Sequence, residues 1–140
     1  IAGMAFALKK AYQQKDLYLK HLSTLKAHAL TLLQALLPEA RINGVPTLEG
    51  SHPGILNFYL PPEKADDLLL IHLDLAGVCA SGTSACSSGS GHPSHVLQAI
   101  GLSPEEAVRA VRLSWGWGSE KAHLEVAIQT LRQSLLSPTA

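Results

Sequence analysis

One of the two cysteines, Cys86, stands in a stretch of small and hydroxylated residues that runs from Ser81 to Gly91. The stretch has no large apolar side chain in which a thiol could be buried. A structural cysteine usually lies among apolar neighbours, whereas a nucleophilic cysteine must be reachable as a thiolate. The composition therefore indicates a presented, reactive thiol at Cys86, although the stretch considered alone also fits an incidental solvent-facing cysteine.

Arg112 lies in a segment whose other residues are largely apolar, from Ala110 to Trp115. A buried guanidinium is costly unless it meets an anion, and its planar fork can pair with both oxygens of a carboxylate. The pattern indicates either a site for a carboxylate ligand or a salt bridge to an internal acidic residue. Trp115 and the nearby Trp117 are interpreted as packing residues and not as a stacking platform.

Other chemistries are less well supported by the residues around Cys86. Cys86, His92 and His95 offer thiolate and imidazole ligands for zinc, but they are only three and lack a paired Cys-x-x-Cys. The stretch also lacks the Gly-x-x-x-x-Gly-Lys-(Ser/Thr) pattern of a phosphate-binding loop, and no Gly-x-Ser-x-Gly marks a serine hydrolase. The other cysteine, Cys79, stands in an apolar segment and is predicted to be a core residue.

Hydrophobic periodicity predicts helices and strands that alternate along the chain. Apolar residues recur near the 3.6-residue period over residues 1–37, which indicates a long N-terminal helix that Pro38 ends. Ser103, Pro104 and Glu106 have the pattern of a helix capping box. The alternation predicts a single α/β domain over residues 1–140, with a short, partly antiparallel sheet packed against helices. Strands are expected at 41–47, 54–60, 77–80 and 110–116, and further helices at 63–73, at 95–100 and from 119 onwards.

Length and charge limit the classes of protein that fit. The chain has 140 residues, which suffices for one hydrophobic core. Eleven basic and eleven acidic side chains leave no net charge, so the charge does not favour binding to nucleic acid or to an anionic membrane. Two cysteines are too few for a disulfide framework, and without a signal peptide or a long apolar span a cytoplasmic protein is expected. The sequence starts without Met and inside a helical pattern, which predicts part of a longer protein.

The segments that hold the two chemical candidates resemble one known family. Residues 73–97, with Cys86 at their centre, resemble the active-site loop of the NifS/IscS-type cysteine desulfurases. Val-Arg-Leu-Ser-Trp-Gly at 111–116 and Gly-Ile-Leu-Asn at 54–57 resemble two strands of the same family. The resemblance runs without gaps from residue 1 to about residue 131 and corresponds to the C-terminal part of these enzymes.

The resemblance implies a relative of the class-V aminotransferases. The chain would be the small C-terminal domain of a fold-type I pyridoxal-phosphate enzyme, with its cysteine loop at residues 81–92. Such enzymes convert L-cysteine to L-alanine and leave the sulfur as a persulfide on the loop cysteine, here Cys86. Arg112 corresponds to the arginine that binds the substrate carboxylate. Pyridoxal phosphate would be bound by a lysine in a large domain outside this chain, so the chain alone is expected to be inactive.

Partners are also implied by the resemblance. The persulfide sulfur would pass to an acceptor or scaffold protein for the assembly of iron–sulfur clusters or thio-cofactors, and Cys86 would be a transient ligand of the nascent cluster. The full-length enzyme would be a homodimer formed mainly through the large domain. Apolar side chains of the 1–37 helix should then be exposed in this chain, because the surface that they contact is missing.

Two positions depart from the family's pattern, and two other functions stay open. The glycine that precedes the loop cysteine has moved one place towards the N-terminus, to Gly82, and His92 stands where Glu is common. Neither change removes a reacting group, but a selenocysteine lyase-like relative is an alternative. A stand-alone sulfur-carrier or partner-docking module without catalysis is another. The presence of both Cys86 and Arg112 favours the enzyme over the docking module.

Overall fold

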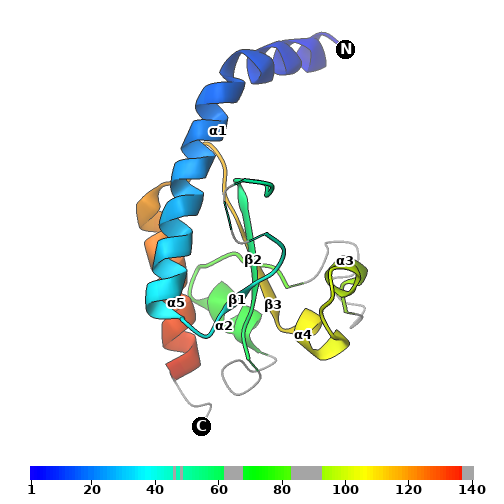
Figure 1. Cartoon of the computed structure of the whole chain (residues 1–140). Coiled ribbons are helices and arrows are strands. Elements are labelled where there is room, and N and C mark those ends of the chain that lie inside the picture. The colour runs from blue at the N-terminus through cyan, green and yellow to red at the C-terminus, as the bar shows by residue number, and fades with distance from the viewer. Residues whose placement is uncertain (46, 48, 62–67, 83–92, 137–140) are drawn as a thin grey trace.

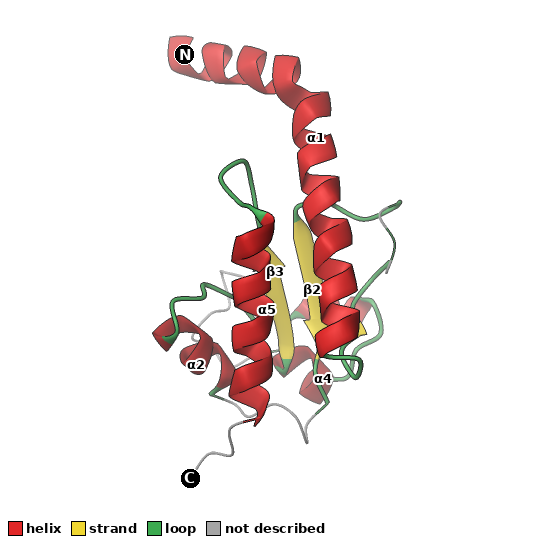
Figure 2. Ribbon diagram, turned by 90° about the vertical axis from the view of Figure 1, so that its left-hand side faces the viewer, coloured by secondary structure: helices red, strands yellow, loops and turns green. Residues whose placement is uncertain are grey.

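The computed structural model describes residues 1–45, 47, 49–61, 68–82 and 93–136. The three strands form one antiparallel sheet in the order β1–β2–β3. Helices α1 and α5 lie side by side across one face of this sheet (Figures 1 and 2). The α/β class and the long N-terminal helix are confirmed. In chain order, the elements are α1 (Ala2–Leu36), β1 (Arg41–Ile42), β2 (Ile55–Tyr59), α2 (Leu69–Leu75), α3 (His95–Ala99), α4 (Pro104–Val108), β3 (Ala110–Ser114) and α5 (Lys121–Leu136).

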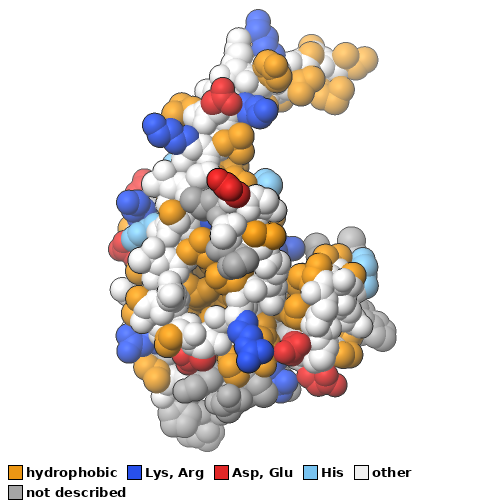
Figure 3. Space-filling view, viewed as in Figure 1, with side chains coloured by type: hydrophobic (Ala, Val, Ile, Leu, Met, Phe, Trp, Pro, Cys, Tyr) orange, Lys and Arg blue, Asp and Glu red, His pale blue; other side chains and the backbone are white. Residues whose placement is uncertain are grey.

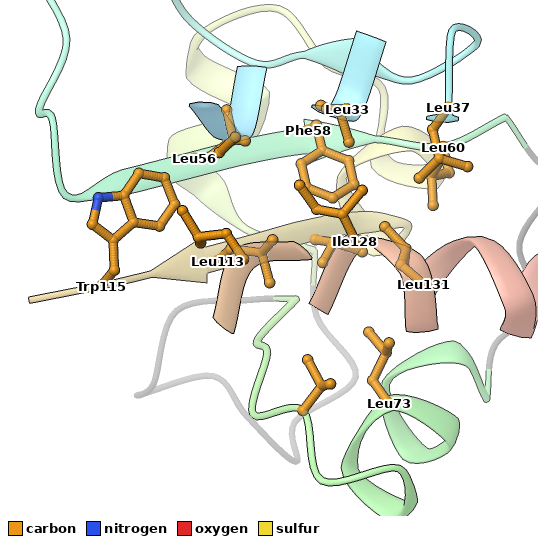
Figure 4. Packing of buried hydrophobic residues seen from close by; sticks show 14 of the residues in the cluster. Leu33, Leu37, Leu56, Phe58, Leu60, Leu73, Leu113, Trp115, Ile128 and Leu131 are labelled. Atoms are coloured by element: carbon orange, nitrogen blue, oxygen red, sulfur yellow. The ribbon is translucent and has the colours of Figure 1, made fainter. Parts of the chain in front are cut away.

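The hydrophobic core fills the space between the sheet and the two long helices. Phe58 of β2 lies between Leu33 of α1 and Ile128 of α5 (Figure 4), and all three side chains are buried. Each such side chain contributes roughly 1.5–3 kcal/mol through removal from water. Every third or fourth side chain of the two helices points into the core, and so does every second side chain of the strands. The members of the core from these four elements include Leu22, Leu25, Ala29, Leu33, Leu56, Phe58, Val111, Leu113, Leu124, Ile128 and Leu131.

The N-terminal part of α1 extends beyond the sheet and bends away from the rest of the helix (Figures 1 and 2). The first buried side chain of α1 is Leu22. Apolar side chains before it are exposed and gather at the end of the molecule (Figure 3). The expected apolar exposure on this helix is therefore confirmed. The large exposed ones are Ile1, Met4, Phe6, Leu8, Tyr12, Leu17 and Leu19.

Two of the predicted elements differ from the structure at their boundaries. The strand predicted at 41–47 pairs only over β1, because Gly44 adopts a φ of 85°, a left-handed conformation that does not continue a strand. The helix predicted at 63–73 is present as α2, which starts at Leu69 and ends at Leu75. Residues 62–67 lie outside the described residues.

The strand predicted at 77–80 is absent. Gly77 turns the chain after α2 with a φ of 80°, and the residues that follow form a single bridge, from Ser81 to Arg112. Cys79 is exposed in this segment. The prediction that Cys79 is a core residue was therefore wrong. Its neighbours Val78 and Ala80 are not paired into the sheet, and these two residues, not Cys79, pack in or against the core.

The predicted capping box is confirmed and starts α4 directly before β3. The Ser103 hydroxyl accepts a hydrogen bond from the Glu106 amide at 3.2 Å, and the Glu106 carboxylate accepts one from the Ser103 amide at 2.9 Å. This start directs Ala107 towards Leu97 of α3 and Ala110 of β3, with which it forms a small second cluster. None of the described helices combines the length and the apolar character that crossing a bilayer requires.

Candidate functional site

Arg112 lies in the middle of β3, on the face of the sheet turned away from α1 and α5. Its neighbours Val111 and Leu113 are buried in the core, so the alternation of the strand places Arg112 on the opposite face. The Arg112 backbone pairs with Ser81: its amide donates to the Ser81 carbonyl at 2.6 Å and its carbonyl accepts from the Ser81 amide at 3.1 Å. With β2 on its other side, this part of β3 is held on both edges.

Two asparagines continue the row of residues that starts at Arg112. Asn57 of β2 lies opposite Arg112 in the sheet register, and Asn43 follows β1. The Asn43 amide donates to the Asn57 carbonyl at 2.9 Å, and Asn43 Nδ2 donates to Asn57 Oδ1 at 2.6 Å. Asn43, Asn57 and Arg112, which we call the polar row, thus cross the sheet on one face.

The Arg112 guanidinium lacks an internal counter-ion within the described part of the chain. Its Nε atom is buried and has no hydrogen-bond partner there. Among the described residues, Glu125 lies against His28 and not against Arg112. A buried donor without an acceptor is unfavourable. Among the described residues, the salt bridge considered as the alternative for Arg112 is not formed, and the arrangement favours an external anion.

The residues on both sides of the cysteine loop are anchored beside Arg112. Ser81 pairs with Arg112, and the buried Gly82 lies against the carbonyl of Ala110 and the side chain of Leu70. At the other end, the buried Ser94 begins α3 and accepts a hydrogen bond from the Leu97 amide at 3.5 Å. Both ends of the loop therefore attach to the end of β3 that carries Ala110.

Cys86 and His92 lie outside the described residues, so the reactive thiol at Cys86 stays a prediction. His95 is exposed at the first position of α3. Across the described ranges, no three His, Cys, Asp or Glu side chains come close enough to hold a metal ion. Two of the three ligands considered for zinc, Cys86 and His92, are outside these ranges, so the zinc site is not tested.

Cys79 faces a cavity of about 320 Å³ between β3, α5 and the segment that follows α2. Val78, Leu113 and Trp115 form part of its apolar wall. Trp115 is 8% exposed and belongs to the core, which confirms the packing interpretation. Trp117 is half exposed and stacks on Tyr18 of α1, with ring centroids 4.8 Å apart. It therefore packs against a tyrosine and is not buried.

The sequence interpretation missed the two asparagines of the polar row as functional candidates. Asn57 was noted only within the Ile-Leu-Asn strand motif. An asparagine in the centre of a short apolar strand is an available signal, because Asn is uncommon in strand interiors. Its register opposite Arg112 could not be read from the sequence, since antiparallel pairing depends on tertiary structure.

The described lysines do not fit a Schiff base with pyridoxal phosphate. Lys26 is buried, and burial lowers its pKa, but its ammonium donates to Ser51 Oγ at 2.7 Å and to the His52 carbonyl at 2.9 Å. Lys26 therefore links residues 51–52 to α1 by hydrogen bonds. The other described lysines are exposed on α1 and α5. This part of the chain offers no lysine suited to hold that cofactor.

The sequence is similar to curated cysteine desulfurases. It is 32% identical to cysteine desulfurase IscS of Clostridium botulinum over 131 residues, which are 94% of this chain and 33% of that protein. It is 33% identical to putative cysteine desulfurase IscS 1 of Bacillus subtilis, over 91% of this chain and 33% of the relative. The chain thus spans about one third of the length of the curated relatives that it matches. No protein-family model matches the chain.

Solved structures share the fold. A NifS-like protein superposes on 96% of this chain with a TM-score of 0.75 and 23% identity, and a NifS-like protein from Rickettsia africae superposes on 86% with a TM-score of 0.69 and 21% identity. The chain covers 32% and 30% of these two structures. In sequence, this chain is therefore similar to about one third of the curated cysteine desulfurases, and in fold to about one third of the NifS-like structures.

Proposed function

We propose that this chain forms the substrate-carboxylate side and the sulfur-accepting loop of a pyridoxal-phosphate-dependent cysteine desulfurase. The observation that carries the proposal is Arg112 Nε, which is buried in a half-buried side chain and has no partner among the described residues. Arg112 is paired to Ser81, five residues before Cys86 in the sequence. The chain therefore combines an anion-binding group with the base of the loop that holds the thiol.

Arg112 binds the carboxylate of L-cysteine through the two parallel N–H groups of its fork. Its backbone is held by β2 and by Ser81, so the Cα atom from which the side chain extends has a fixed position. Binding the carboxylate fixes the orientation of the amino acid and therefore the direction of its thiol. This positioning lowers the entropy that is lost when the substrate reacts.

Cys86 acts as the nucleophile. Its thiolate attacks the substrate sulfur and forms a sulfur–sulfur bond, while the carbon–sulfur bond breaks and its electron pair stays with the amino acid. The substrate carbon then takes up a proton and leaves as L-alanine, and Cys86 carries the persulfide. Pyridoxal phosphate supplies the electron sink for this chemistry and is bound by a part of the full-length protein outside the described residues.

The full-length enzyme is proposed to act in the cytoplasm as a homodimer. The Cys86 persulfide passes to a sulfur acceptor or scaffold protein that builds iron–sulfur clusters or thio-cofactors. Cys86 would be a transient ligand of a cluster during this transfer, since thiolates suit iron–sulfur centres.

The experiment treats the full-length protein with L-cysteine and locates the persulfide by alkylation and peptide mass analysis. We expect the additional sulfur on the peptide that contains Cys86, and Cys86→Ser should abolish sulfur transfer to an acceptor. Cys79→Ser is the matched control, because it removes the other cysteine, and it should keep most of the activity. Additional sulfur found on Cys79 alone, or full transfer by Cys86→Ser, would overturn the proposal.

A further inference from the structure

We propose that Asn57 is a second binding residue for the substrate carboxylate and that Asn43 positions its amide group. This inference rests on the proposed function of Arg112 and deepens it. The carboxylate site would then consist of the polar row, with donors from Asn57 and Arg112 and an orienting contact from Asn43.

The backbone pairing brings the Asn57 and Arg112 side chains close together. In an antiparallel pair, directly opposite residues either exchange both backbone hydrogen bonds or exchange none, and the side chains are closer in the second case. The Arg112 amide and carbonyl are both directed to Ser81, and the Asn57 carbonyl accepts from Asn43. Asn57 and Arg112 are therefore a non-hydrogen-bonded pair, whose side chains stand next to each other on one face of the sheet.

The contact with Asn43 determines which end of the Asn57 amide is free. Asn57 Oδ1 accepts from Asn43 Nδ2 at 2.6 Å, so the oxygen is directed to the side of β1. The amino group of Asn57 is the remaining end, and it donates only. If the amide were reversed, Oδ1 would face β3 and could accept from the guanidinium. The observed orientation instead adds donors beside Arg112.

Two adjacent donor groups on one face of the sheet suit an anion. Arg112 Nε is buried and unpartnered within the described residues, and Asn57 is half-buried. A planar carboxylate has two oxygens and about four acceptor positions, so it can accept from a guanidinium and an amide together. The polar row thus has the chemistry of a carboxylate site that is larger than Arg112 alone.

The test compares two ligands of the full-length protein that differ only at the carboxyl group. L-Alanine carries the carboxylate and lacks the reactive thiol, whereas L-alaninamide is neutral at that position. Dissociation constants are measured by calorimetry for the wild type and for Asn57→Asp, Asn57→Ser, Asn43→Ala and Arg112→Lys. Tyr59→Phe is the matched control, because Tyr59 lies two residues from Asn57 on the same strand and the same face.

Asn57→Asp keeps the shape of the side chain and places a carboxylate beside Arg112. We expect L-alanine binding to weaken at least about tenfold, because a charge-assisted hydrogen bond is lost and an internal anion competes for the guanidinium. Binding of L-alaninamide should change less than about twofold, since it makes no charge-assisted contact at this position. The midpoint of thermal unfolding should not fall, because the new carboxylate gives the buried Nε an acceptor. Asn57→Ser should also weaken L-alanine binding, but it gives the buried Nε no carboxylate acceptor. Asn43→Ala should weaken L-alanine binding less than either Asn57 variant.

The outcomes separate this inference from the proposed function. If Arg112→Lys loses the preference for L-alanine over L-alaninamide while both Asn57 variants keep it, Arg112 binds the carboxylate alone and the inference is wrong. If Arg112→Lys keeps the preference for L-alanine over L-alaninamide, Arg112 does not bind the carboxylate, and both the proposed role of Arg112 and the inference that rests on it are wrong. A third outcome is that both Asn57 variants bind L-alanine and L-alaninamide equally more weakly and unfold at a lower temperature. Asn57 would then be a structural residue only, and the inference would be wrong.

Discussion

A Cβ atom placed on Gly82 would lie 3.2 Å from the carbonyl oxygen of Ala110 and 3.0 Å from Cδ1 of Leu70. Gly82 does not have a positive φ. Its lack of a side chain is therefore required by close packing and not by backbone conformation. Gly82 therefore fits closely against β3 at the point where the loop begins.

Gly82→Ala should consequently destabilise the protein. The added methyl group meets a backbone oxygen that cannot move without distorting β3, and overpacking of this kind costs about 1–3 kcal/mol. Urea unfolding measures the change in the free energy of unfolding. Gly118→Ala is the matched control, because no described atom lies within 4 Å of its Cβ position, and its effect should be neutral or slightly stabilising. Equal effects of the two substitutions would show that the close approach at Gly82 is unimportant.

The ion pair between α1 and α5 should contribute little to stability. His28 Nε2 lies 2.8 Å from Glu125 Oε1, and the Glu125 side chain is 45% exposed. Pairs at such exposed positions are screened by water and contribute roughly 0–1 kcal/mol. Glu125→Gln should therefore lower the free energy of unfolding by less than about 1 kcal/mol, and added salt should reduce the difference. Glu120→Gln, at an exposed position before the same helix, provides the reference.

Lys26 should make stability depend on pH in alkaline solution. Burial lowers its pKa below the ordinary value of 10.5. Between the two pKa values the unfolded chain binds more protons than the folded chain, so this group's contribution to stability increases as the pH rises through that window. The free energy of unfolding of the wild type relative to Lys26→Met should grow as the pH approaches 10.5 from below.

The exposed Lys15 provides the control for this measurement, because Lys15→Met removes a lysine from the same helix without a buried ammonium. Its stability relative to the wild type should not show the same increase with pH. A wild-type advantage over Lys26→Met that shrinks with rising pH would contradict the prediction, because it would mean that the folded state favours the charged lysine.

Cys79 should react readily in the folded protein. Its side chain is exposed and lines the cavity beside β3 and α5. In a Cys86→Ser background, a small maleimide should label Cys79 completely under native conditions. Cys79→Ser with Cys86→Ser is the blank. Labelling that requires denaturant would show that the cavity is closed in solution and would contradict the prediction.

The sequence predicted the helices better than the strands, and particular residues explain the difference. The apolar repeat that contains Leu22, Leu25, Ala29 and Leu33 directly reflects the face of α1 that meets the sheet. The apolar run at 77–80 looked like a strand, but Gly77 changes the direction of the chain there. Hydrophobic periodicity indicates which residues prefer to be buried. It does not indicate which backbone groups form the hydrogen bonds of a sheet.

The site was predictable in part for the same reason. A guanidinium in an apolar strand identified Arg112, because the cost of burying a charge is a property of the residue and its neighbours. The contribution of Asn57 depends on register and on the direction of its amide, both of which are fixed by contacts with distant residues. The exposure of Cys79 likewise depends on the absence of a strand neighbour.

The division of α1 into an unpacked part and a packed part has a consequence for its local stability. Among the described residues, those before Tyr18 do not belong to the core, so their helical state depends on local hydrogen bonds and propensity, which sustain only marginal helices at this length. The amides from Leu22 to Leu33 are protected by the tertiary core. In hydrogen-exchange terms, α1 should therefore behave as two units of very different opening free energy within one continuous helix, with the boundary near the Tyr18–Trp117 stack.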